Sequence, residues 1–189
     1  MTMAAPTGKP LAPAEIDEAF GNGSLFGRSA FRLELLDEYD SPADRERMRR
    51  WLAGESQGED VRTYWDQVIS AARRRGATMT RVHAIPSDGQ LSDYLRFEFD
   101  FYRGSVEAGE DIRILLADQT TAAGIGPCDF WIFDDVRVVV QYYGPRGRWL
   151  RGELVTDPVF VETCRCRRDA ALSKAIPFSV YIAERSTAA

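Results

Sequence analysis

Residues 128–143 read Cys-Asp-Phe-Trp-Ile-Phe-Asp-Asp-Val-Arg-Val-Val-Val-Gln-Tyr-Tyr, two runs of β-branched and aromatic residues around Asp134 and Asp135. Such residues favour the pleated, half-buried surface of a sheet, and two consecutive acidic residues suit a tight connection between strands. The stretch therefore predicts a β-hairpin at the centre of the core. Because alternate residues of a strand face opposite sides, Asp129 and Trp131 should share one face.

Two helices are predicted upstream of the hairpin. Ser41 and Pro42 combine a capping residue with proline at the first helical position, and Gly54 should end that helix. The next segment repeats apolar residues at three- and four-residue spacing up to Gly76, which is typical of an amphipathic helix. Together they form an N-terminal helical pair.

The elements next to the hairpin follow from the same kinds of signal. Met79–Ile85 predicts a strand, and Ser92 can cap a helix through about Tyr102, although the alternation of apolar residues there would also suit a strand. The remaining segments are predicted as a strand at Ile112–Leu116, a glycine-rich loop at Thr120–Pro127, a strand at Trp149–Val155, a helix from Val159 to Leu172 after the Asp157 cap, and an extended segment at Phe178–Ile182.

This order predicts an α/β (α+β) fold with a mixed β-sheet flanked by helices. A chain of 189 residues that is 44% hydrophobic can bury one substantial core. We expect a single domain over residues 28–182, a flexible N-terminal segment over 1–27 with one short helix at Ala14–Phe20, and a disordered tail over 183–189.

Charge and cysteine content limit the function classes. The formal net charge of -5 makes nucleic acid a poor candidate partner, because phosphate contacts need a basic surface. Three cysteines and no secretory signal predict a cytoplasmic protein without a disulfide framework, and no run is long enough to span a membrane. Cys164, Cys166 and the only histidine, His83, do not make a zinc spacing, so we expect no metal and no cofactor.

Several separated motifs stand out in order over about Arg28–Ile182. They are Ser29–Glu34, Ser41-Pro42, Trp51–Gly54, Asp93–Glu98, Ala108–Arg113 and Asp129–Asp135. These motifs resemble an uncharacterised actinobacterial family that is known mainly as a domain of unknown function. The resemblance implies a small protein of the kind encoded near helix-turn-helix regulators, and it implies no activity.

The element order and the hairpin also resemble one half of a phospholipase-D-like domain. That superfamily carries His-x-Lys on a strand, with an acid after the following turn, and the histidine is the nucleophile. When Asp135 is placed at the acid, Cys128 and Phe130 stand where His and Lys should be. Fold kinship would then imply a non-catalytic descendant, because phospholipase D chemistry is excluded by the missing motif.

Charged residues near the ends of apolar elements form the candidate site. Arg96, Arg113, Asp129 and Trp131 are the candidate ligand-binding residues, and in an enzyme Glu98, Asp111 and Asp129 would supply acid–base catalysis. The alternative is structural, since Arg–Glu pairs and acidic turns often join helices to sheets. In the same way His83 and the thiol of Cys128 fit a packed core as well as a reactive site.

Three functions remain open at this point. The first is a non-catalytic phospholipase-D-like regulatory or accessory module that binds a partner protein or a small ligand. The second is a small-molecule enzyme of specialised metabolism that uses an Arg/Asp/Glu cleft. The third is a nucleic-acid-binding partner of a transcription regulator. The sequence is also compatible with a homodimer.

Overall fold

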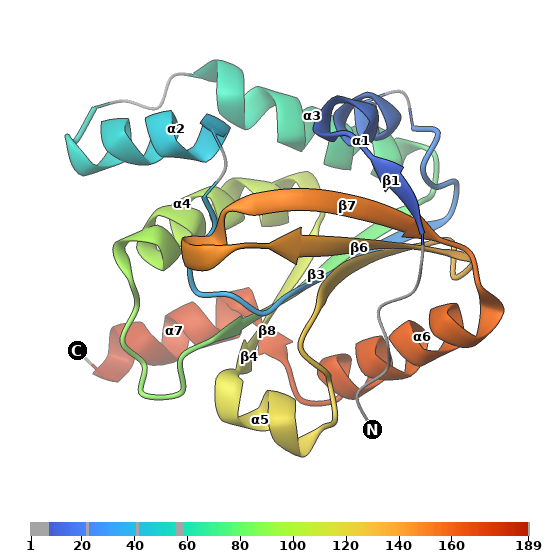
Figure 1. Ribbon diagram of the computed structural model, residues 1–189. Helices are drawn as coiled ribbons and strands as arrows, with labels where there is room; N and C mark the ends of the chain where they lie inside the picture. The colour runs from blue at the N-terminus through green and yellow to red at the C-terminus, as the bar shows by residue number, and fades with distance from the viewer. Residues whose placement is uncertain (1–7, 22, 41, 56–58, 189) are drawn as a thin grey trace.

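The computed structural model describes residues 8–21, 23–40, 42–55 and 59–188. Within them lies an eight-stranded sheet with the order β1-β7-β6-β5-β2-β3-β4-β8 (Figure 1). The strands are β1 (Lys9–Leu11), β2 (Ser29–Glu34), β3 (Thr78–Ile85), β4 (Asp111–Leu116), β5 (Asp129–Phe133), β6 (Arg137–Tyr143), β7 (Trp149–Val155) and β8 (Ile176–Pro177). β2, β3 and β4 run parallel, and the other neighbouring pairs run antiparallel. The mixed sheet flanked by helices that the sequence predicts is confirmed.

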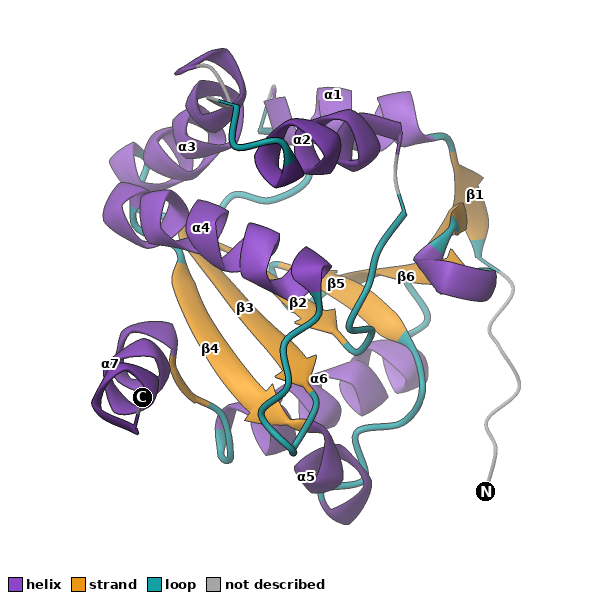
Figure 2. Cartoon of the chain, turned by 90° about the vertical axis from the view of Figure 1, so that its left-hand side faces the viewer, coloured by secondary structure: helices purple, strands orange, loops and turns teal. Residues whose placement is uncertain are grey.

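Helices cover both faces of this sheet (Figures 1 and 2). They are α1 (Pro13–Gly21), α2 (Pro42–Leu52), α3 (Glu59–Arg74), α4 (Asp93–Ala108), α5 (Ala117–Ala122), α6 (Pro158–Leu172) and α7 (Phe178–Ala188), with a 3-10 turn at Pro145–Gly147. The crossovers β2-α2-α3-β3 and β3-α4-β4 step across the sheet in the same direction. Right-handed crossovers of that kind place their helices on one face, so α2, α3 and α4 share a side, which α1 joins.

The opposite face of the sheet is closed by α6 and by the short helix α5 (Figure 2). Phe130 and Ile132 of β5 pack there with Phe160 and Cys164 of α6 in the largest apolar cluster. At the far edge α7 packs beside β4, and its Phe178 meets Phe99 of α4 with ring centroids 5.2 Å apart. The apolar core is therefore divided by the sheet.

The hairpin is confirmed. β5 pairs with β6 from Asp129 opposite Gln141 to Phe133 opposite Arg137. Asp134 and Asp135 both adopt the left-handed conformation, with φ of 53° and 62°, as a two-residue turn that matches strand twist requires. The Asp134 carboxylate also accepts backbone hydrogen bonds from Gly27, Arg28 and Ser29 at 2.7–2.9 Å, which fixes the start of β2 against the turn.

Several predicted boundaries differ from the structure. The extended segment expected at Phe178–Ile182 is wrong: it is the start of helix α7, which continues to Ala188 over the expected tail. The loop expected at Thr120–Pro127 begins inside α5, and β1, β2 and β8 were not predicted as strands. In the N-terminal segment the short helix expected at Ala14–Phe20 is α1, and its Phe20 is buried against Trp131, while β1 adds a strand to the edge of the sheet. The Ser41 cap and residues 1–7 lie outside the described residues.

Three predicted helices do match their signals. α4 begins after Ser92, whose hydroxyl accepts from the Leu95 amide at 3.1 Å, and Gly109 ends it in the left-handed conformation. α6 begins after Asp157, whose carboxylate accepts from the Phe160 amide at 2.9 Å. The amphipathic helix that precedes Gly76 is α3. None of the helices in the described part of the chain has the length and apolar character that a membrane span requires.

We predict that Asp134→Asn lowers the free energy of unfolding by about 2 kcal/mol at neutral pH, because it removes charge from a side chain that accepts three amide hydrogen bonds. Those amides hold the pKa of Asp134 below its usual value against the opposing effect of burial. The difference should therefore shrink as the pH falls through the carboxyl range. Urea denaturation measures it, with the exposed Asp118→Asn as control; equal effects of the two variants would contradict the assigned role.

Candidate functional site

A cavity of about 720 Å³ lies between the sheet and helices α1–α4. Its floor is formed by the strands β2, β3, β5, β6 and β7, with the side chains of Arg32, Glu34, Arg81, Trp131, Gln141, Tyr143 and Trp149. Its walls and roof come from α1, α2, α3 and α4, with Ile16, Phe20, Asp44, Arg47, Tyr64, Trp65, Asp66, Tyr94, Glu98, Phe101, Tyr102 and Ser105. Tyr39, Asp40 and Gly147 complete the lining. The volume lies within the range of small-molecule sites.

Charged side chains occupy the middle of the floor. β2 and β3 pair in parallel with Arg32 beside Arg81 and Glu34 beside His83, and strand alternation turns all four toward the helices α1–α4. Glu34 is 2% exposed and holds both guanidiniums, Arg32 at 2.7 Å and Arg81 at 2.8 Å. Burial opposes its ionisation, but the two arginines outweigh burial and lower the pKa of Glu34 to about 2.

Arg81 extends this network away from Glu34. Its Nε donates to Glu110 at 3.0 Å, and the other oxygen of Glu110 accepts from the Trp65 indole at 3.2 Å. Both ends of the Arg81 guanidinium are thus bound to buried carboxylates. Such a fully paired set is the condition under which charges are tolerated inside a protein.

His83 is held beside the network as a neutral ring. Its Nε2 lies 2.8 Å from the Leu36 carbonyl oxygen, which only accepts, so this nitrogen carries the proton. Burial lowers the pKa of His83, and the unprotonated Nδ1 then accepts from the Tyr102 hydroxyl at 2.7 Å. The histidine therefore has a structural position, with both nitrogens engaged.

Glu98 differs from the other acidic groups of the cavity. It lines the cavity from α4, one turn from Tyr94 and one turn from Tyr102. Burial, followed by the charges of Glu34 and Asp44, raises the pKa of Glu98 to about 7. Among the residues that the structure describes, none forms an ion pair or a hydrogen bond with its carboxylate. A carboxyl group poised in this way can exchange a proton near neutral pH.

Asp129 lies just behind the wall of the cavity. One of its oxygens accepts a short hydrogen bond from the Tyr39 hydroxyl, and the other accepts from the Leu35 amide at 3.2 Å. Burial raises the pKa of Asp129 to about 7, although these hydrogen bonds oppose the rise. Tyr39 in turn packs edge-on against Tyr143 at 5.0 Å, so the tyrosines stand between Asp129 and the open space.

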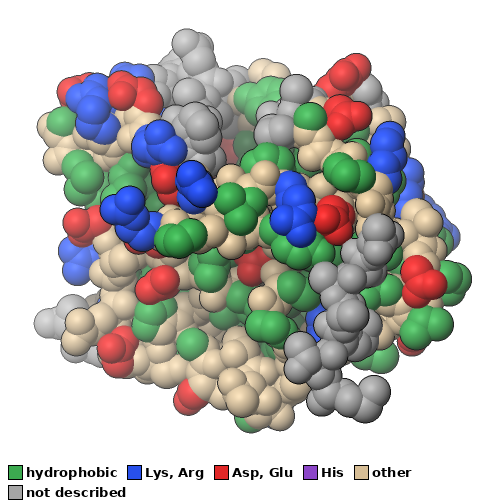
Figure 3. Space-filling model, in the orientation of Figure 1, with side chains coloured by type: hydrophobic (Ala, Val, Ile, Leu, Met, Phe, Trp, Pro, Cys, Tyr) green, Lys and Arg blue, Asp and Glu red, His purple; other side chains and the backbone are tan. Residues whose placement is uncertain are grey.

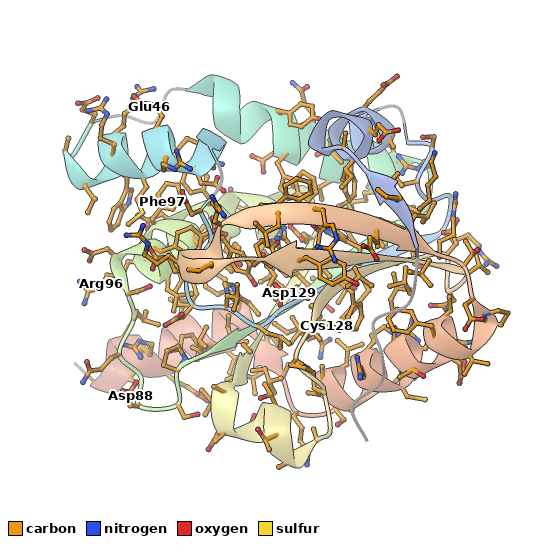
Figure 4. The ribbon with its side chains drawn as sticks, viewed as in Figure 1. Glu46, Asp88, Arg96, Phe97, Cys128 and Asp129 are labelled. Carbon is orange, nitrogen blue, oxygen red and sulfur yellow. The ribbon has the colours of Figure 1, made fainter. Side chains whose placement is uncertain are left out.

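The structure brings together only some of the residues that the sequence singles out. Glu98 and Trp131 line the cavity, and Asp129 supports its wall. Arg96 is 61% exposed and faces Asp93 at 3.8 Å, well away from Asp129 in Figure 4. Arg113 pairs with Asp111 at 3.0 Å on the surface. Asp135, at the hairpin turn, pairs with Arg168 of α6.

Sequence reasoning did not select Arg32, Glu34 or Arg81, which form the charged floor. Ser29–Glu34 was recognised as a motif but not as a strand, so its alternation of polar and apolar residues was not used. Arg81 stood inside the predicted strand Met79–Ile85. A charged residue at an inward position of a central strand is the signal that would have located this network.

The comparison with known families bears on residues 14–183, which match a family described as a domain of unknown function (DUF6879). The chain belongs to this family. The matched region of the DUF6879 domain contains every residue that lines the cavity. No curated protein matches the chain.

We predict that Glu34→Gln lowers the free energy of unfolding by about 3–5 kcal/mol at neutral pH, because it leaves two arginines without their buried counter-charge. Since the pKa of Glu34 is lowered, its contribution is present above the usual carboxyl range and is lost as the pH falls toward about 2. Urea denaturation provides the measurement.

Glu46→Gln is the matched control for this variant. Glu46 also pairs with an arginine, Arg49 at 2.8 Å, but on the exposed surface of α2 (Figure 4). Its loss should cost far less stability than the loss of Glu34, because solvent screens the exposed pair. If Glu34→Gln were as mild as Glu46→Gln, the buried network would not be the stabilising element described here.

Proposed function

We propose that this chain is a regulatory or accessory module that binds a small ligand in the cavity between the sheet and helices α1–α4. The observation that carries the proposal is the cavity itself: about 720 Å³ of space with an aromatic lining and a charged floor inside a single domain. Ligand sites combine apolar walls with a few polar groups that fix orientation, and this cavity has both.

The position of α2 supports a regulatory role. α2 reaches the cavity through Asp44 and Arg47 and packs against α4, where Arg47 lies 4.1 Å from the ring centre of Phe101. A ligand between the sheet and α4 would therefore contact the side chains that position α2. On the outer side of the molecule Arg and acidic side chains are interspersed (Figure 3), and pairs such as Arg49–Glu46 lie on α2. A partner protein would sense the ligand through this surface.

The groups available for covalent catalysis support binding rather than turnover. In the phospholipase-D-like ancestry that we propose, Cys128 and Phe130 replace the reactive pair, and Phe130 is fully buried. Burial raises the pKa of the Cys128 thiol although Arg167 lies 3.4 Å away, so the thiolate form is disfavoured. His83 is committed to Leu36 and Tyr102. Neither Cys128 nor His83 therefore combines a reactive nucleophile with a free base beside it.

We expect a library of metabolite-sized compounds to contain ligands that raise the melting temperature of the protein. Tyr143→Leu should abolish the shift, because Tyr143 lines the cavity. The adjacent Tyr142→Leu is the control, since Tyr142 belongs to the opposite face of β6 and packs against the α6 cluster. A screen without hits, or hits that respond equally to both substitutions, would count against a ligand in this cavity.

A second candidate is a small-molecule enzyme of specialised metabolism, and the state of Glu98 is the observation that favours it. A carboxyl group with a pKa of about 7 inside a cavity can act as a general base or acid. In this case the ligand would be a substrate whose proton Glu98 removes.

For the enzyme we expect incubation with a metabolite extract to change the mass of a component, and Glu98→Gln to abolish the change. Mass spectrometry of the extract before and after incubation is the measurement. Asp111→Asn is the control, because that carboxylate is exposed and pairs with Arg113 outside the cavity. Ligand-induced stabilisation without any mass change would favour the binding module over the enzyme.

A further inference from the structure

The guanidiniums of the cavity are already bound to carboxylates, which bears on the charge of the ligand. Arg32 and Arg81 share Glu34, and Arg81 also holds Glu110. Arg47 pairs with Asp44 at 3.0 Å. A phosphate or carboxylate ligand would have to displace one of these carboxylates from a desolvated pair. The cavity is therefore poorly suited to anions.

Acidic groups outnumber basic ones in the lining. Five carboxyl groups and three guanidiniums face the cavity. Of these carboxyl groups, Asp40 is bonded to Arg45, while Glu34 and Asp44 have the partners given above. Glu98 has no ion pair or hydrogen bond with any residue in the described part of the chain. It is the group to which a ligand can supply a missing partner.

The walls of the cavity suit a cation as well. Ten of its twenty-two lining residues are aromatic. Their faces already attract positive charge, since the Arg32 guanidinium lies 5.2 Å from the ring centre of Trp131 and that of Arg81 lies 5.1 Å from Tyr102. Tyr94, Phe101 and Tyr102 stand on the same side of α4 as Glu98. Rings around a carboxylate are the usual recognition chemistry for ammonium groups.

From this arrangement we propose that the ligand carries an amine or quaternary ammonium group whose counter-ion is the Glu98 carboxylate, with the cavity rings packed around it. The inference rests on the proposed ligand-binding function and adds the chemical class of the ligand. The cation completes the charge pairing of the cavity, and the buried arginine–glutamate network stays intact when it binds.

Ligand binding should then depend on the protonation of Glu98. Its pKa responds to Glu34 and Arg32 of β2, Arg81 of β3 and Asp44 of α2, and it interacts with Tyr94 and Tyr102 of its own helix. The other charged and titratable groups that line the cavity are Arg47 of α2, Tyr64 and Asp66 of α3, Tyr143 of β6, and Tyr39 and Asp40. A cation favours the ionised carboxylate, so binding lowers the pKa of Glu98 from about 7 and releases a proton. Affinity should fall in acid and level off above neutral pH.

Three probes of similar size test the charge preference by isothermal titration calorimetry: benzyltrimethylammonium, benzyl alcohol and benzenesulfonate. We expect the ammonium to bind most tightly, and its affinity to fall about tenfold between about pH 8 and about pH 6, as the fraction of ionised Glu98 falls. In Glu98→Gln the affinity should drop about tenfold or more at the higher pH, and the pH dependence should disappear. Gln keeps the shape of the side chain, and the melting temperature of the variant confirms its folding.

Glu107→Gln is the matched control, because Glu107 is an exposed carboxylate on the same helix. It should bind the ammonium as the unchanged protein does. Equal or tighter binding of benzenesulfonate would overturn the inference while leaving the cavity as a ligand site. A pH dependence that survives in Glu98→Gln would also overturn it. If none of the three probes binds, the proposal of a cationic ligand is rejected. If the compound screen also finds no ligand, the ligand-binding function itself is rejected.

Discussion

The central constraint on this fold is the carboxylate of Glu34, which one arginine of its own strand and one of the neighbouring strand share inside the protein. Arg32 and Arg81 lie side by side in the parallel register of β2 and β3, where like charges repel. Each oxygen of Glu34 takes one of them, at 2.7 and 2.8 Å. The link from Arg81 to Glu110 then joins these strands to the turn that leads into β4. Three segments far apart in the sequence are held by one set of buried charges.

The cavity follows from this charged floor. An apolar helix face cannot pack on paired guanidiniums without leaving them poorly solvated, so α4 presents Tyr94, Glu98 and Tyr102 to that side. Its apolar residues Leu95 and Phe99 turn instead toward β4 and α7. Over the charged floor, α1 and α3 contribute the rings of Phe20, Tyr64 and Trp65, and α2 contributes Asp44 and Arg47. The polar residues of β2 and β3 thereby leave an open cavity between the sheet and α4.

The sequence predicted those parts of the fold that local signals determine. The hairpin, the Ser92 and Asp157 caps and the helix before Gly76 follow from residue types within a few positions of each other. α7 was expected to be extended because its first residues, Phe178–Ile182, are mostly aromatic or β-branched, and its helical conformation depends on packing against α4 and β4. β2 was passed over because its central position in the sheet is set by partners far along the chain.

The same difference between local signals and long-range packing explains which residues of the candidate site the sequence identified. Residues two apart lie about 200° apart around a helix, so Glu98 faces the cavity while Arg96 faces solvent. Along β4, the alternation of side chains places Ile112 and Ile114 on the face that packs against α4, and Arg113 on the opposite face. Each of these assignments needs the correct element type and its orientation, whereas residue type alone grouped all the charged positions together. Trp131 and Asp129 were placed on one face because strand alternation was sufficient there.

Three carboxyl groups on this side of the sheet differ in what they can do because their partners differ. Glu34 is ionised by two arginines, and the pKa values of Asp129 and Glu98 are both raised to about 7. Asp129 is nevertheless occupied, since the Tyr39 hydroxyl and the Leu35 amide bind its two oxygens and so tie the loop after β2 to the hairpin. Glu98 alone combines a proton that exchanges near neutrality with direct access to the cavity. The hairpin that decides the fold therefore supports the wall of the cavity, and Glu98, the group that we propose meets a ligand, lines the cavity from α4.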